Sequence, residues 1–147
     1  MSCLQAGETC AWLNAATAGG VLGGEVTEMS VKRAKTADDA ACTFVRRQAS
    51  LVLELRIEVE TMTAPARDFA SYTARCRSAV VPLSAIGNEA VACSDDNGQS
   101  GRAEQVVGRV RDRAFIIRIG TSDRSARSEP LRDKARDVAE QVAGILF

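Results

Sequence analysis

The chain contains no histidine, and aromatic residues make up only 4% of its 147 residues. Histidine is the usual general base beside a serine or cysteine nucleophile and the commonest ligand of catalytic zinc. The charges also cancel, because nineteen Lys and Arg stand against nineteen Asp and Glu. A neutral chain lacks the attraction that drives non-specific binding to nucleic acid or anionic membranes. We therefore expect no histidine-based catalysis, no nucleic-acid partner and no cofactor.

Long apolar runs are also missing. No stretch approaches the roughly 20 apolar residues that a membrane-spanning helix needs. The N-terminal letters MSCLQAGETC contain neither a basic region nor an apolar stretch, so no signal peptide is visible. The length suits one domain over residues 1–147, with 1–9 as a flexible N-terminal segment.

Five cysteines are present, and none of them forms a CxxC pair. Scattered cysteines in a chain of this length are more typical of a disulfide-bonded exported domain than of a zinc or redox protein. We therefore expect a periplasmic or outer cell-envelope location, with an export signal removed before this N-terminus. A cytosolic protein with five free thiols is the alternative.

The segment 50–61 is the clearest strand. Leu51, Leu53 and Leu55 begin an apolar series that continues to Val59, and charged residues alternate with it from Glu54 to Glu60. A period of two with one apolar and one polar side is typical of an antiparallel sheet covered on one face.

The helices have recognisable ends. Asn14 is a good N-cap and Gly23 a typical C-terminal stop for a short first helix. Pro65 and Pro130 stand where prolines commonly begin helices. In the second helix, Phe69, Tyr72 and Cys76 are expected to share one face. The remaining strands are predicted at 26–34, 41–47, 87–94, 104–110 and 114–120, with turns at 35–39 and 95–98.

The expected fold class is therefore α+β: a curved antiparallel sheet of about six strands with helices on one face. The element order is α-β-β-β-α-β-β-β-α. Its two halves are alike, since each has three strands followed by a helix.

Several short motifs resemble a group of bacterial exported lipoprotein-type domains. They are Cys10 before a helix that ends in Leu22-Gly23, the Cys-x-aromatic triplet Cys42-Thr43-Phe44, the turn Ala85-Ile86-Gly87-Asn88-Glu89-Ala90, a hairpin with an apolar second arm and a closing amphipathic helix. The family pattern has Gly and Asp where this chain has Ala85 and Asn88, and Cys76 and Cys93 are additional. The resemblance implies a fold of the TATA-box-binding-protein type. It brings no catalytic residues.

Two disulfides are expected, Cys10–Cys42 and Cys76–Cys93. The first would join the first helix to the second strand, and the second would join the second helix to the strand after it. Buried free thiols are the alternative, because free cysteine behaves as a small apolar residue. Cys3 has no partner in this pairing. It could carry a lipid, form an intermolecular disulfide or have no role.

Other chemistries find little support. No cysteine pair has zinc-knuckle spacing, and Cys93 occupies the first position of the calcium-loop-like run that ends at Glu104. The glycines of 19–24 end a helix and lack the Lys-Ser/Thr of a phosphate loop. The arginines of the last hairpin are expected to form a solvated face neutralised by Asp112 and nearby acids, in preference to an anion site. They are Arg109, Arg111, Arg113 and Arg118.

The sequence thus indicates a non-enzymatic, cell-envelope domain that binds a protein partner or a small polar ligand. Because Glu54, Arg56, Glu58 and Glu60 project from the sheet, its helix-free face is polar, which disfavours a lipid. The alternatives are a structural or assembly role in an envelope complex and an enzyme with an unrecognised site.

Overall fold

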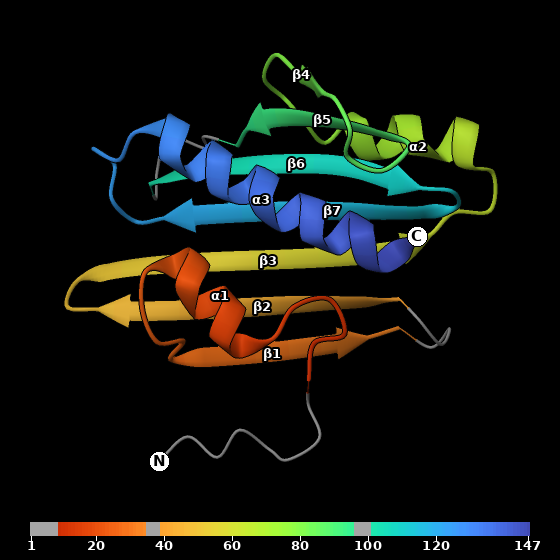
Figure 1. Cartoon of the computed structure of the whole chain (residues 1–147). Helices are drawn as coiled ribbons and strands as arrows, with labels where there is room; N and C mark the ends of the chain where they lie inside the picture. The colour runs from red at the N-terminus through yellow and green to blue at the C-terminus, as the bar shows by residue number, and fades with distance from the viewer. Residues whose placement is uncertain (1–8, 35–38, 96–100) are drawn as a thin grey trace.

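Seven strands form a single antiparallel sheet in the computed structural model, which describes residues 9–34, 39–95 and 101–147. The strand order is β1-β2-β3-β7-β6-β5-β4 (Figure 1). The strands are β1 (Glu28–Arg33), β2 (Ala40–Gln48), β3 (Leu51–Thr61), β4 (Val81–Leu83), β5 (Glu89–Ser94), β6 (Arg102–Val110) and β7 (Arg113–Thr121). The helices are α1 (Ala15–Leu22), α2 (Pro65–Thr73) and α3 (Ser128–Leu146).

The predicted α+β class and antiparallel sheet are confirmed, but the strand count is seven instead of about six. The additional strand is β4, which pairs with β5 at the edge of the sheet. It has three residues and contains Pro82. Such a segment is too short to show a period of two, and proline is tolerated there because an edge strand leaves backbone groups unpaired.

Helices α1 and α3 cover one face of the sheet, the near face in Figure 1. The main core lies beneath them and includes Phe44, Leu55, Ile57 and Phe115, all fully buried. Gly108 stands directly opposite Phe115 on the neighbouring strand, and a Cβ there would overlap the aromatic ring. A glycine at this position therefore lets the largest side chain of β7 lie flat across β6.

Helix α2 packs against the opposite face, so the expectation of helices on one face only is corrected. A second apolar cluster joins Phe69 of α2 and Met62 to Val107 and Ile116 of the sheet. The side chains of Val107 and Ile116 point away from the main core because strand residues alternate between faces. Tyr72 and Cys76 pack against this cluster as predicted, although Cys76 lies beyond the end of the helix.

Local signals account for the helix ends. The Asn14 side chain accepts a hydrogen bond from the backbone N–H of Thr17 at 2.7 Å, and Gly23 ends α1 with φ of 84°. At the start of α2, the Asp68 carboxylate accepts from the backbone N–H of Ala64 at 2.9 Å. This hydrogen bond, assisted by Arg67, lowers the pKa of Asp68. These contacts satisfy backbone groups that the first turn of each helix would otherwise leave unpaired.

Both predicted disulfides are present. Cys10–Cys42 joins the segment before α1 to β2, and Cys76–Cys93 joins the segment after α2 to β5. Cys42 and Cys93 are almost fully buried. Each bridge therefore attaches a helical segment to a different face of the sheet. Cys3, the turn residues 35–38 and the turn residues 96–98 lie outside the described residues.

Within the described ranges, no helix is long and apolar enough to cross a membrane. The longest, α3, is amphipathic as predicted, and its buried side includes Leu131, Ala135, Val138 and Val142. The sequence pattern leaves Ile145 or Leu146 as the end of this stripe, and it is Leu146 that packs against the main core, whereas Ile145 is 52% exposed. The stripe therefore reaches the last turn of the helix.

Candidate functional site

One part of the sheet is left uncovered by helices. It is the portion of the α2-bearing face that lies over β1, β2, β3 and the C-terminal half of β7, and we call it the open face. The strand registers place ten residues on it. They are Ser30, Lys32, Ala41, Thr43, Val45, Glu54, Arg56, Glu58, Arg118 and Gly120. Of the polar residues predicted for the helix-free side of β3, Glu54, Arg56 and Glu58 lie here, and Glu60 lies on the same side of the strand but against Tyr72 of α2.

Small residues of β2 form the floor of the open face, and longer charged residues stand on both sides. Thr43 pairs with Ser30 of β1 and Arg56 of β3, and Ala41 pairs with Lys32 and Glu58. A depression of about 370 Å³ lies at the end of the open face that holds Ala41, and it is lined by Lys32, Arg56 and Glu58 among others. The surface is therefore polar, indented and mixed in charge.

Most charges beside α2 are already paired with each other. The Glu58 carboxylate forms ion pairs with Arg56 at 2.7 Å and with Arg75 at 3.4 Å. The Glu60 carboxylate accepts a hydrogen bond from the Tyr72 hydroxyl at 2.5 Å. The guanidinium of Arg75 also lies 5.0 Å from the centre of the Tyr72 ring. These contacts join α2 to β3, so this part of the face has a structural role.

Burial of its hydroxyl raises the pKa of Tyr72 to about 12, and the hydrogen bond to Glu60 adds to the effect. The chain has a single tyrosine, so phenolate absorbance reports this group alone. We expect native protein to titrate near that value, against about 10 for an ordinary tyrosine. Since the folded pKa is raised, the stabilisation is complete below about pH 10 and is lost as the pH rises toward 12.

The matched variant for this titration is Glu60→Gln, which keeps the side-chain shape but removes the carboxylate that opposes phenolate. Its phenol should titrate at lower pH than that of the unmodified chain. Circular dichroism recorded alongside separates ionisation in the folded state from ionisation on unfolding. A native phenol that titrates near 10 would contradict the predicted contact.

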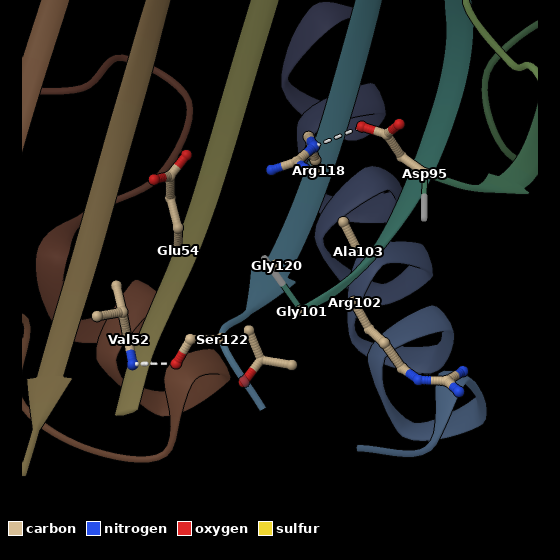
Figure 2. A pocket seen from close by; sticks show the side chains of 10 residues that line it. Val52, Glu54, Asp95, Gly101, Arg102, Ala103, Arg118, Gly120 and Ser122 are labelled. Atoms are coloured by element: carbon tan, nitrogen blue, oxygen red, sulfur yellow. Dashed lines mark hydrogen bonds and ion pairs between the residues drawn. The ribbon is translucent and has the colours of Figure 1, made fainter. Parts of the chain in front are cut away.

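A smaller and more polar cavity lies at the other end of the open face. This hollow, of about 180 Å³, is formed where β3, β7 and β6 run side by side (Figure 2). Its walls carry Glu54 of β3, Arg118 of β7 and Asp95, and Ser122 lies at its rim. Its floor is formed by two small residues, Gly120 of β7 and Ala103 of β6, which pair with each other across the two strands. Glu54 pairs with Gly120 on the other side.

Backbone contacts fix the edges of the hollow. The Val52 N–H donates to the Ser122 hydroxyl oxygen at 2.9 Å, and the Ser122 N–H donates to the Val52 carbonyl at 2.9 Å. On the far side, the Asp95 N–H donates to the Ala103 carbonyl at 2.9 Å. The charged side chains therefore project from a backbone that is held on both sides.

The charges of the hollow are only partly paired. Arg118 Nε lies 2.9 Å from a carboxylate oxygen of Asp95, and the dashed line in Figure 2 marks this pair. Among the described residues, Glu54 has no ion pair or side-chain hydrogen bond. The carboxylates of Glu54 and Asp95 and the guanidinium of Arg118 thus face a small space, and Glu54 has no side-chain partner among the described residues. Arg102 also lines the hollow, but its side chain donates to the Arg124 carbonyl and the Ser128 hydroxyl.

The arginines of the β6–β7 hairpin do not form a common basic patch. Arg109 pairs with Glu89 at 3.0 Å, and Arg118 pairs with Asp95. The expectation of neutralised charges is therefore correct for these two. Their partners are acids of β5 and of the residue after it, and not Asp112. Pairing across strands depends on register, which the sequence does not reveal.

No catalytic or metal centre stands out in the part of the chain that the structure describes. There, no group of three or more His, Cys, Asp or Glu residues could hold a metal ion. One buried acid, Glu104, lies on the opposite face beneath α3, where its carboxylate accepts from Ser94 Oγ at 3.0 Å and pairs with Arg132 at 3.3 Å. This ion pair joins α3 to β6 of the sheet.

In comparisons with protein families, curated proteins and solved structures, nothing matches this chain. The two disulfides are compatible with an oxidising, extracytoplasmic compartment. The candidate site therefore stands on its own geometry, which is a polar open face with a hollow at one end.

Proposed function

We propose that the chain is a non-enzymatic binding domain of the cell envelope, exported and of the lipoprotein type that its motifs resemble. Its open face would contact a polar ligand or a protein partner. In this proposal, Cys3 carries the lipid anchor. The observation that carries the proposal is the open face itself, a broad polar sheet surface with two depressions, whereas α1 and α3 cover the main core on the opposite face and α2 covers the second apolar cluster.

The composition of the open face favours a polar ligand over a lipid. The large apolar side chains that are exposed lie elsewhere, namely Leu51, Val80, Val81, Ile145 and Phe147. A lipid-binding cavity is normally lined by apolar side chains. The open face instead presents carboxylates, guanidinium groups and hydroxyls on a rigid strand scaffold. Such groups fix the orientation of polar ligands.

Two disulfides support a location in which reducing systems do not reach the domain. Disulfides persist in the periplasm and outside the cell and are rare in the cytosol. They also fit a binding role, since they stiffen the sheet from which the open face projects. A structural or assembly role is the second candidate, favoured by the exposed Val80 and Val81 beside the short edge strand β4.

Site-specific photo-crosslinking in the producing cell tests the binding role. A photoreactive amino acid is placed at Thr43, in the middle of the open face, in the full chain. We expect a discrete adduct with a partner or ligand, because the side chain at this position projects into the presumed contact area. Electrophoresis and mass spectrometry detect the adduct.

The matched control places the same group at Arg136, on the exposed side of α3. It should give no adduct. A third position, Val81, addresses the assembly alternative. Adducts at Val81 without adducts at Thr43 would favour assembly through the β4 edge and would count against the open face.

A further inference from the structure

The hollow holds two opposite charges that do not neutralise each other. Arg118 donates a hydrogen bond from Nε to the Asp95 carboxylate, and its two terminal nitrogens donate to no described residue. Glu54 lines the same space and makes no ion pair with Arg118 or with any other described residue. Opposite charges that share a small space without pairing leave room for a ligand between them.

The strand register sets the spacing of the two charges. Glu54 stands directly opposite Gly120, and Arg118 lies two residues away from Gly120 on the same strand. Such diagonal neighbours have Cβ atoms roughly 7 Å apart. Since a Cβ at Gly120 would lie 3.3 Å from Arg118 Nη1, the guanidinium reaches over the glycine and toward the hollow.

We propose that the hollow binds a small zwitterion of the α-amino-acid type. Its carboxylate would accept hydrogen bonds from the terminal nitrogens of Arg118, whose planar donors match carboxylate geometry. Its ammonium group would donate to the Glu54 carboxylate. Asp95 acts as a positioning residue, because it holds the Arg118 guanidinium through Nε. This inference rests on the proposed binding function of the open face.

The charge arrangement favours a zwitterion over an ion of one sign. An anion would meet Arg118 but would also lie close to Glu54 and Asp95. A cation would meet Glu54 but would lie beside the Arg118 guanidinium. A ligand with both charges satisfies both groups at once and carries no net charge into the hollow. The volume of about 180 Å³ is below the usual range of drug-sized pockets, so the ligand must be small.

A titration of the full chain followed by amide chemical shifts tests the proposal. The probes are L-alanine, propionate, ethylammonium and the dipeptide alanyl-alanine, at low ionic strength. We expect alanine to give saturable shifts at Ala103, Gly120 and Ser122. Propionate and ethylammonium each lack one charge and should bind about tenfold more weakly, the loss expected for one charge-assisted hydrogen bond. The dipeptide separates the charges further and should also bind more weakly.

Two variants test the residues, and each keeps the fold measurable. Glu54→Gln is isosteric at a half-buried position, and it should weaken alanine binding about tenfold without weakening propionate binding. Gly120→Val fills the floor of the hollow without changing any charge, and it should abolish the shifts. Asp133→Asn removes a carboxylate from α3, far from the hollow, and should bind alanine like the unmodified chain. Circular dichroism verifies that each variant is folded.

The outcomes separate this inference from the proposed function. Equal binding of alanine and propionate would make the hollow an anion site and overturn the zwitterion. Alanine that shifts no hollow residue would overturn it as well. If crosslinking at Thr43 still gives an adduct in that case, the open face binds something other than a small zwitterion. If both experiments fail, the proposed function is wrong too.

Discussion

Removal of the Cys10–Cys42 disulfide should lower the free energy of unfolding by about 3–4 kcal/mol. The bridge joins residues 32 positions apart, and the chain-entropy model assigns this cost to the extra freedom that the unfolded chain gains once the cross-link is gone. The total free energy of unfolding of a native domain is typically about 5–15 kcal/mol, so this loss is a large share of it. The variant is Cys10→Ala with Cys42→Ala, and urea denaturation without reductant measures it.

The second bridge supplies the comparison. Cys76 and Cys93 are 17 positions apart, so their removal should cost about 3 kcal/mol, slightly less than the first. Thiol titration of each denatured variant before reduction verifies that the remaining bridge is intact. An unchanged urea midpoint after removal of Cys10 and Cys42 would show that the first bridge contributes nothing to stability.

Arg132→Ala should destabilise the domain nearly as strongly. It removes the guanidinium that pairs with Glu104, whose carboxylate is only 1% exposed. Breaking a buried pair leaves an uncompensated charge and costs about 3–5 kcal/mol. Since the Arg132 side chain is 42% exposed, water can partly replace it, and the effect should fall at the lower end of that range. Chemical denaturation gives the free energy directly.

Two variants show whether the buried charge is the cause. Adding Glu104→Gln to Arg132→Ala removes the charge and keeps the hydrogen bond from Ser94, so the double variant should be more stable than the single one. Arg136→Ala breaks an exposed pair with Glu140 on the same helix and should cost about 0.5 kcal/mol or less. Equal losses for Arg132→Ala and the double variant would assign the effect to packing of the arginine stem.

Strand β3 shows how far sequence patterns reach. Its alternation from Leu51 to Val59 predicts both the strand and its two faces, because each residue contributes a side chain to one face or the other. The cap at Asn14 and the helix starts near Pro65 and Pro130 follow from equally local rules. These features depend only on neighbours in the chain.

The position of α2 has a signal in the sequences of β6 and β7. In β6 and β7, Val106 and Val107 are both buried, and so are Ile116 and Ile117. Adjacent apolar residues in a strand indicate cover on both faces, since neighbours point in opposite directions. The amphipathic pattern of α2 shows that one side of the helix is buried. It does not show against which face of the sheet.

The sequence by itself determined the three helices, six of the seven strands, the α+β class and the cysteines that can form disulfides, because these follow from local periodicity, capping and composition. Only the tertiary structure decided the strand order β3-β7-β6 and the register within it. That register sets Glu54 beside Gly120 and Arg118 beside Asp95, although these residues come from separate parts of the chain. A site made by pairing distant strands has no local signature, so the hollow emerges only once the sheet is assembled.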